Sequence, residues 1–393
     1  MIKRYLFFSL IIFAFACKST TPEGSYRAVV KRDDGLNPSF IVNEKKENGK
    51  RTWVITNADE QLVIEDIVER GDSLLINMPF FEANLKLAKT SSGYLGVWIK
   101  ETSKGIQTMP IELISSTQRL DWKVQTPLHS ITGTWETVFT NKEGKQSIAI
   151  GEFIQEGNKL KGTFLTTTGD YRFLEGEVSG DSLILTTFDG THAFFFSATI
   201  NAAGNQLEGI FASGPTSTQS WVAKKTEQVA LDGSNVEMKL KGVENTLKFK
   251  FLNLDSQWVS IEDARFKNKV VVIQIMGSWC PNCMDETAYL SQYYAKNKDK
   301  GIEMIALAYE YSEDFSRARK NLSRFQKRFH VDYPILITGV TSSDSLKTEK
   351  TLPQFTPIVA FPSMIVLGRD GTVRKTHAGY DGPATGEHHE KFK

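Results

Sequence analysis

The sequence predicts a multidomain protein in which two antiparallel β-rich units precede an α/β domain. Three observations support this division. Strand-like segments rich in β-branched and aromatic residues recur between residues 24 and 225. A weak internal repeat divides that stretch into two halves. From about residue 245, strand-like and helix-like segments alternate, which is typical of an α/β sheet.

The chain has 393 residues, enough for two or three domains with hydrophobic cores of their own. Its 47 Lys and Arg residues almost balance 46 Asp and Glu residues, for a formal net charge of +1. A balanced charge offers no broad basic surface to nucleic acid, so we expect no nucleic-acid partner. The three cysteines, Cys17, Cys280 and Cys283, are too few for a disulfide-stabilised scaffold.

The first 16 residues have the features of an export signal. Lys3 and Arg4 precede an apolar run at residues 5–16, which is shorter than the ~20 residues that span a bilayer. The next residue, Cys17, makes the junction resemble a bacterial lipobox, in which the cysteine is lipidated and becomes the first mature residue. We therefore expect a lipoprotein signal at 1–16, a tether at 17–23 and a location in the cell envelope, facing the periplasm. The alternative is a plain secreted protein with an incidental Cys17.

We expect the two β-rich units at residues 24–125 and 130–225, with a spacing or docking role. The repeat includes the sequence Gly-Asp-Ser-Leu at both 71–74 and 180–183. One esterase family carries its nucleophilic serine in such a run, but a nucleophile requires a base within reach. A Gly-Asp-Ser triplet between two strands is also ordinary turn chemistry. Its recurrence therefore predicts two hairpins.

A linker at 226–244 leads to the α/β domain, which we expect at 245–393. Residues 270–276 are almost continuously apolar, as in a buried central strand. We expect a helix at about 280–296, a strand at 302–308, and a second helix whose apolar face spans 315–329. The next expected elements are a strand at 333–337 and a hairpin formed by residues 364–367 and 372–376.

Cys280 and Cys283 form a Cys-x-x-Cys pair where the central strand meets the first helix. Cys280 occupies the helix N-terminus, where free N–H groups and the helix dipole favour a thiolate, the form that attacks disulfides. Cys283 lies one turn into the helix, within disulfide reach, and would resolve the mixed disulfide. A zinc site would require two more ligands, and no second cysteine pair exists. We expect no metal and no cofactor.

The segment Gly-Ser-Trp-Cys-Pro-Asn-Cys-Met-Asp-Glu at 277–286 resembles the active site of the TlpA/ResA-like thiol–disulfide oxidoreductases, as does Phe-Pro-Ser at 361–363. The resemblance covers about residues 245–393. It implies a thioredoxin-like fold, a disulfide-bearing protein substrate and a membrane electron donor. It also implies that Glu286 serves the active-site thiols, and that Pro362 follows a cis peptide bond and faces the cysteine pair.

The resemblance also implies supporting roles for other residues. We expect Trp279 to shield the site, Phe361 to lie beside it, and Pro281 to help set the reduction potential. Thioredoxin itself has a buried acid where this chain has Gln274, so Glu286 is the candidate proton carrier. Asp285 lies on another part of the helix surface and is given no role.

Two other functions compete with a thiol–disulfide oxidoreductase. A peroxiredoxin-like peroxidase, with an antioxidant activity, would share the fold. Those enzymes usually place the reactive cysteine after a threonine, without a partner two residues further on. The other alternative is an envelope binding module, in which the β-rich units hold a partner and the redox domain is accessory.

The lipobox-like junction generates the first testable prediction. Replacing Cys17 by Ser removes the sulfur to which lipid would be attached, so the protein should move from the membrane fraction to the soluble fraction. Fractionation of cells that express either form measures this. A Cys17→Ser protein that stays membrane-bound to the wild-type extent would contradict the lipoprotein prediction.

Overall fold

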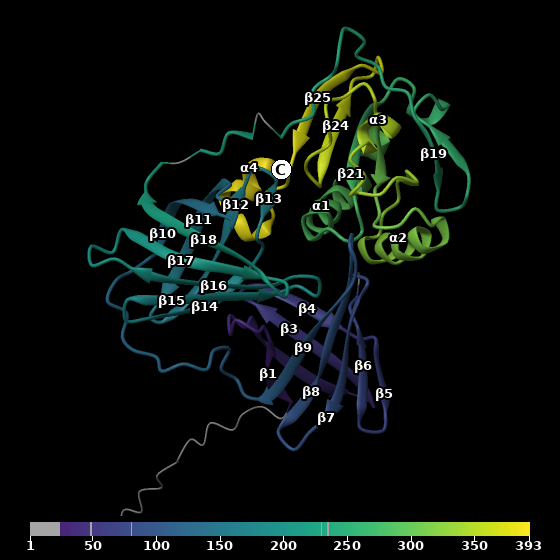
Figure 1. Ribbon diagram of the computed structural model, residues 1–393. Coiled ribbons are helices and arrows are strands. Elements are labelled where there is room, and N and C mark those ends of the chain that lie inside the picture. Colours follow the sequence, from purple (N-terminus) through teal and green to yellow (C-terminus); the bar gives the residue numbers. More distant parts are fainter. Residues whose placement is uncertain (1–23, 48, 80, 229, 234–235) are drawn as a thin grey trace, which may run out of the picture.

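The computed structural model describes residues 24–393 apart from 48, 80, 229 and 234–235. The predicted signal, the tether and Cys17 lie outside the described residues. Among the described helices, none is long and apolar enough to cross a membrane. The described chain forms two β units and an α/β domain, which confirms the predicted fold class (Figure 1).

The first β unit is one antiparallel sheet of nine strands, in the order β4-β3-β2-β1-β9-β8-β7-β6-β5. Inward-facing side chains alternate with outward-facing ones, as in β7, where Ala83, Leu85 and Leu87 are buried. The strands are β1 (Ser25–Val30), β2 (Ser39–Glu47), β3 (Lys50–Asn57), β4 (Glu60–Ile64), β5 (Ile67–Arg70), β6 (Ser73–Asn77), β7 (Ala83–Lys89), β8 (Gly93–Thr102) and β9 (Gly105–Ser115).

The second β unit is also antiparallel, and pairing between β11 and β12 closes it into a barrel. Large aromatic side chains fill its interior, among them the fully buried Phe139, Phe164 and Phe196. The strands are β10 (Gly133–Thr140), β11 (Gln146–Glu156), β12 (Lys159–Thr166), β13 (Gly169–Asp170), β14 (Leu174–Ser179), β15 (Ser182–Phe188), β16 (Ala193–Ile200), β17 (Gln206–Ser213) and β18 (Ser217–Thr226).

Both Gly-Asp-Ser-Leu runs form tight hairpins, as predicted. Gly71 joins β5 to β6 with φ 57°, and Gly180 joins β14 to β15 with φ 60°. Glycine adopts this left-handed conformation without steric cost, which explains why the triplet recurs at these two turns.

The α/β domain is built on a seven-stranded sheet in the order β20-β19-β23-β22-β21-β24-β25. The central strand β21 is parallel to β22 and antiparallel to β24. The strands are β19 (Lys250–Asn253), β20 (Trp258–Ser260), β21 (Val270–Met276), β22 (Ile302–Ala308), β23 (Ile335–Ile337), β24 (Ser363–Leu367) and β25 (Val373–Ala378). The α-helices are α1 (Pro281–Asn297), α2 (Phe315–Phe329), α3 (Lys347–Thr351) and α4 (Glu387–Phe392), with 3₁₀ turns at η2 (Ala264–Phe266), η3 (Lys298–Lys300) and η4 (Pro383–Thr385).

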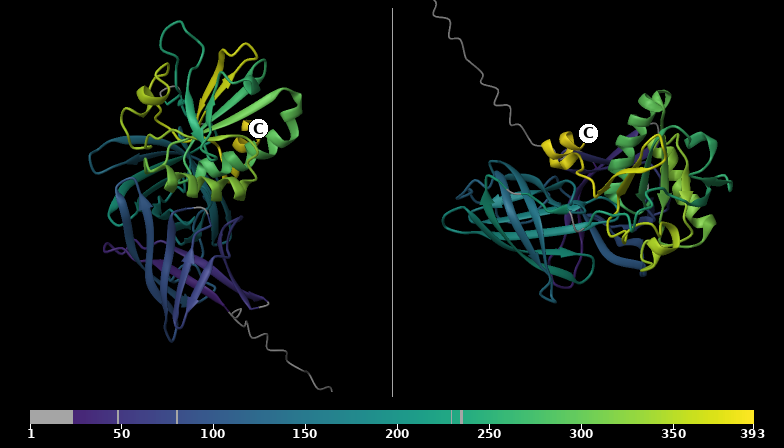
Figure 2. Two further views of the ribbon diagram at one scale, coloured as in Figure 1. Left: turned by 90° about the vertical axis from the view of Figure 1, so that its right-hand side faces the viewer. Right: turned by 90° about the horizontal axis from the view of Figure 1, so that it is seen from above.

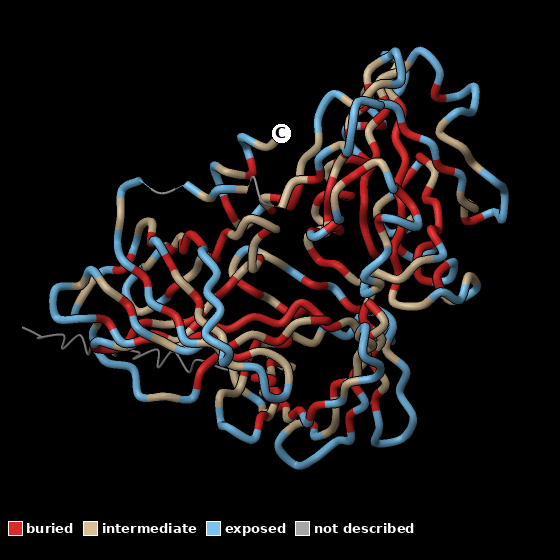
Figure 3. Tube along the Cα trace, turned by 45° about the horizontal axis from the view of Figure 1, so that its top comes forward, coloured by how far each residue is buried: buried red, intermediate tan, exposed pale blue. Residues whose placement is uncertain are grey.

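The three parts pack against one another, and buried chain segments continue through their junctions (Figures 2 and 3). Arg119, in the connection between the two β units, is buried and donates hydrogen bonds to Ser39 O at 3.1 Å and to Glu175 Oε2 at 2.7 Å. Arg317 of α2 pairs with Glu82 of the first β unit at 2.6 Å. These contacts join the two β units to each other and the α/β domain to the first β unit.

One buried side chain, Arg172, contacts all three parts of the protein. It belongs to the second β unit, between β13 and β14, and its guanidinium forms ion pairs with Glu60 of the first unit and Asp285 of α1. The same group donates to Pro281 O at 3.1 Å. Burial alone would lower the pKa of Arg172, but Asp285 and Glu60 raise it well above its ordinary value. The cation therefore stays charged at this junction.

Arg172 generates a stability prediction. Arg172→Met should leave the largely buried Glu60 and Asp285 carboxylates without this cation, a loss worth about 3–5 kcal/mol. We expect a clearly lower midpoint of thermal unfolding. Arg374→Met is the matched control, because Arg374 is exposed in its ion pair with Asp370. That pair is worth about 0–1 kcal/mol. Equal midpoints for the two variants would contradict the assigned role of Arg172.

Candidate active site

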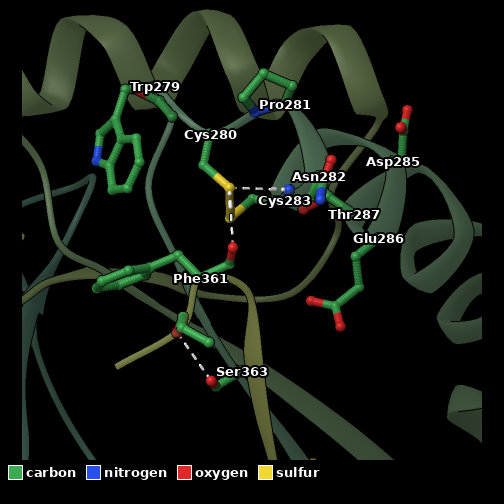
Figure 4. Close-up of a disulfide and its surroundings, with 12 residues drawn as sticks. Trp279, Cys280, Pro281, Asn282, Cys283, Asp285, Glu286, Thr287, Phe361 and Ser363 are labelled. Atoms are coloured by element: carbon green, nitrogen blue, oxygen red, sulfur yellow. Dashed lines mark hydrogen bonds between the residues drawn. A yellow bond between two sulfur atoms is a disulfide. The ribbon is translucent and has the colours of Figure 1, made fainter. Parts of the chain in front are cut away.

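The cysteine pair lies where β21 ends and α1 begins. Cys280 is the N-cap of α1, with extended backbone angles, and Pro281 occupies the first helical turn, where its missing N–H costs nothing. A disulfide joins Cys280 and Cys283 (Figure 4). The Cys283 N–H donates to Cys280 Sγ at 3.2 Å. The N-terminus of α1 is thus directed at the Cys280 sulfur, where it would stabilise a thiolate.

The two cysteines differ in accessibility. Cys280 retains 4% of its surface, whereas Cys283 is fully buried. Of the two cysteines, only Cys280 retains any exposed surface. The predicted order of attack, with Cys280 first, requires this difference.

The loop before β24 faces the disulfide. The Phe361–Pro362 peptide bond is cis, as the resemblance implies. Phe361 O lies 3.5 Å from Cys280 Sγ, on the side of the disulfide opposite Pro281 (Figure 4). Pro362 O accepts a hydrogen bond from Gly379 N at 2.9 Å, which ties this loop to the end of β25.

Trp279 is held in place beside the disulfide. Its indole N–H donates to Tyr309 O at 2.8 Å. The ring stacks on Tyr311 at 4.9 Å and meets Phe361 edge to face at 5.4 Å, measured between ring centroids. Trp279 and Phe361 therefore form an aromatic wall next to Cys280.

Glu286 is fully buried on α1, one turn after Cys283. Its Oε2 accepts a hydrogen bond from Gln274 Nε2 at 2.7 Å, while Oε1 has no hydrogen-bond partner among the described residues. Burial raises the pKa of Glu286 to about 8, against the smaller effect of the Gln274 bond. In Figure 4 its side chain extends from α1 on the opposite side from Asp285. The carboxyl group can therefore hold a proton at neutral pH.

Glu310 is a buried acid beside the site that sequence reasoning missed. It accepts hydrogen bonds from Ser278 N at 2.8 Å and Ser278 Oγ at 2.6 Å, two residues before Cys280. Burial raises its pKa to about 7. Because β21 and β22 are parallel, the residues that follow them meet at one edge of the sheet. That rule, applied to residues 277–280 and 309–311, could have identified Glu310.

The second β unit also reaches the active site, which the sequence did not predict. Asn282 Nδ2, between the two cysteines, donates to Asp170 O at 3.3 Å. The Asp170 carboxylate accepts from Gly382 N at 2.8 Å, and burial together with Asp285 raises its pKa to about 7. Asp285, given no role from the sequence, is half of the buried Arg172 ion pair. The helix position of Asp285 could not reveal a partner on another domain.

The structure brings together the predicted site residues of the α/β domain, namely Trp279, Cys280, Pro281, Cys283, Glu286, Phe361 and Pro362. Within the described part of the chain, no group of three or more His, Cys, Asp or Glu residues could hold a metal ion.

Comparison with known proteins agrees with this geometry. The Redoxin family profile matches residues 241–390. Thiol-disulfide oxidoreductase ResA of Bacillus thuringiensis subsp. konkukian is 28% identical over 137 residues, which cover 35% of this chain and 69% of that protein. ResA of Bacillus subtilis is 22% identical over 129 residues, 33% of this chain and 64% of that protein.

Solved structures give similar coverage. A thiol-disulfide oxidoreductase from Bacteroides fragilis is 16% identical, covers 38% of this chain and 100% of its own, and has a TM-score of 0.29. A thiol:disulfide interchange protein of the thioredoxin family from Chlorobium tepidum is 19% identical, covers 39% and 98%, and has a TM-score of 0.28.

The C-terminal part of the chain is therefore a redoxin domain of the TlpA/ResA-like type. The protein is a thiol–disulfide oxidoreductase similar to ResA in this domain, which implies a disulfide-bearing substrate. The two β units lie outside the matched residues.

The difference between the two sulfurs predicts an order of chemical labelling. In the reduced protein at mildly acidic pH, iodoacetamide should alkylate Cys280 before Cys283. Cys280 is the more accessible sulfur and lies at the helix N-terminus, which favours the reactive thiolate. Mass-spectrometric mapping of the first alkylated peptide measures the order. Alkylation of Cys283 first would reverse the assignment.

Proposed function

We propose that the protein is a membrane-anchored, extracytoplasmic oxidoreductase that reduces disulfides in partner proteins through the Cys280–Cys283 dithiol. The observation that supports this most strongly is the asymmetric pair at the start of α1. Cys280 is slightly exposed and its sulfur accepts a hydrogen bond from a helix N–H, whereas Cys283 is fully buried one turn further on. Lipid on Cys17 would hold the protein at the membrane, close to a membrane thiol donor.

The reaction begins from the reduced pair. The Cys280 thiolate attacks one sulfur of the substrate disulfide, so that a new S–S bond forms and the second substrate sulfur leaves as a thiolate. Cys283, once deprotonated, attacks Cys280 Sγ and releases the first substrate sulfur. The substrate gains two electrons and two protons, and the protein ends in the disulfide form seen here. A dithiol donor restores the reduced pair.

Glu286 would carry the proton of the resolving thiol. An unperturbed thiol has a pKa of about 8.5, close to the value of about 8 to which burial raises Glu286. Proton transfer between groups of similar pKa is nearly balanced in free energy, as acid–base catalysis requires. Ionised Glu286 can accept the proton of Cys283 and later return it when the disulfide is reduced again.

The loop at Phe361 and Pro362 would hold the substrate chain. It borders Cys280 directly and continues into β24. An extended substrate segment laid along such a loop can form strand-like backbone hydrogen bonds. That arrangement would place the substrate sulfur over Cys280.

The proposed activity is tested by reduction of a disulfide-bridged peptide with dithiothreitol as the electron source. The full chain should accelerate the reaction well above the rate with dithiothreitol alone. Cys280→Ser should abolish the acceleration, and Cys283→Ser should stop at a mixed disulfide with the peptide. Equal rates with and without the wild-type protein would reject the function.

Replacing Glu286 by Gln tests the proton carrier. The variant keeps the shape of the side chain but cannot titrate, so we expect disulfide reduction to slow on the order of tenfold. Its pH profile should also shift. Glu262→Gln, at an exposed position, is the matched control and should behave as wild type. An unchanged rate and pH profile for Glu286→Gln would show that Cys283 passes its proton directly to water.

Stability provides a second readout for the same variant. Folded Glu286 keeps its proton until about pH 8, whereas the unfolded side chain loses it near pH 4.5. The folded state therefore binds more protons, and wild-type stability falls as pH rises from 4.5 towards 8. Glu286→Gln should lack this fall, so its stability relative to wild type should increase across that range. Thermal unfolding midpoints at several pH values measure the difference.

A further inference from the structure

A cavity of about 880 Å³ adjoins the accessible sulfur, and the second β unit forms one side of it. The α/β domain contributes Trp279, Cys280 and Phe361, together with the start of α1. The rest of the lining comes from β11, the β12–β13 turn, the segment that leads into β16, and linker residues 230–232 and 236. A cavity of this size is within the range of pockets that bind small ligands or short chain segments.

The cavity is rich in aromatic and apolar groups. These include Ile148, Tyr171, His192 and Phe194 from the second β unit, opposite Trp279 and Phe361. Ile148 is 55% exposed, so its apolar side chain is open to a ligand in the cavity. Phe194 packs edge to face on Tyr171 and stacks against the His192 ring.

The side of the cavity that the second β unit forms is fixed by hydrogen bonds and by close packing against the redox site. Buried Asp189 accepts hydrogen bonds from Thr191 N and His192 N, and its second oxygen lies 3.0 Å from His192 Nδ1, which fixes the imidazole. At the other end of the wall, Gly169 approaches Asn282 so closely that a Cβ would lie 2.0 Å from Asn282 Nδ2. The second β unit is thus in direct contact with the Cys-x-x-Cys turn.

We propose that the residues of the second β unit that line this cavity form the substrate-binding half of the redox site. It receives a disulfide on a flexible peptide segment with an aromatic or large apolar residue beside the cysteine. This rests on the proposed reductase function and assigns a substrate class to it. Cys280 is only 4% exposed and faces this cavity, so a sulfur on a flat folded surface cannot reach it. A flexible segment can enter, and its neighbouring side chain then contacts Phe194 and Ile148.

The chemistry is the exchange described above, carried out within the cavity. The Cys280 thiolate forms a bond to one peptide sulfur, the peptide S–S bond breaks, and the departing thiolate takes a proton from solvent. Cys283 then displaces the second peptide as a thiol. The peptide disulfide is reduced and the cysteine pair is oxidised, with no further reactant.

The test uses the full chain, reduced with dithiothreitol and then freed of it. It is mixed with either of two disulfide-linked dimers, of N-acetyl-Cys-Phe-amide or of N-acetyl-Cys-Gly-amide. The rate at which the cysteine pair is oxidised is measured by alkylating samples at successive times and analysing them by mass spectrometry. The wild type should react faster with the Phe peptide, on the order of fivefold, as expected for aromatic contacts. Phe194→Ala should reduce this preference to about one.

Two tryptophan variants provide a matched pair that leaves the barrel interior intact. Ser147 lines the cavity and Ser220 lies on β18 away from it, and both are exposed. Ser147→Trp should slow reaction with the Phe peptide on the order of tenfold by filling the cavity, whereas Ser220→Trp should match wild type. Equal wild-type rates for the two peptides, or a Ser147→Trp rate equal to that of Ser220→Trp, would overturn the cavity proposal. A wild-type protein that reduces neither peptide would overturn the proposed function as well.

Discussion

The buried guanidinium of Arg172 determines how the three parts of this protein are placed around the disulfide. A single cation from the second β unit forms ion pairs with Glu60 of the first unit and with Asp285 of α1, where that helix begins. Removing three charged groups from water is unfavourable unless each keeps its partner. The network is therefore stable only when both β units and the redoxin domain are docked, and this docking creates the cavity beside Cys280.

Electrostatics near the cysteines follow one pattern. Burial raises the pKa of Glu286 to about 8, and raises the pKa values of Glu310 and Asp170 to about 7. At pH 7 Glu286 is therefore mostly protonated, while Glu310 and Asp170 are about half protonated, so the three acids carry less negative charge than ordinary carboxylates would. The N-terminus of α1 then acts on the Cys280 thiolate against less negative charge than three ionised carboxylates would place there. In the proposed reaction, the ionised fraction of Glu286 accepts the proton of Cys283, and the protonated form returns it when the disulfide is reduced.

Local patterns in the sequence predicted much of the fold and part of the site. The apolar run at 270–276 and the cysteine pair after it located the central strand, the helix and the disulfide, because strand burial and helix capping are local properties. The Arg172–Asp285 pair joins positions far apart in the chain, and no spacing rule links them. Glu310 depended on knowing which strands are neighbours. The β units' contribution to the site likewise arises from docking, which a single sequence does not encode in any periodic pattern.

The central claim is that Cys280 and Cys283 form a working redox couple in the folded protein. The most direct measurement is equilibration of the native full chain with dithiothreitol buffers of graded potential, followed by alkylation and mass spectrometry. The account predicts a reversible two-electron transition confined to these two cysteines, with the protein folded throughout and a tenfold change in equilibrium constant for about 30 mV. A disulfide that stays oxidised until the protein unfolds would be purely structural and would contradict the account.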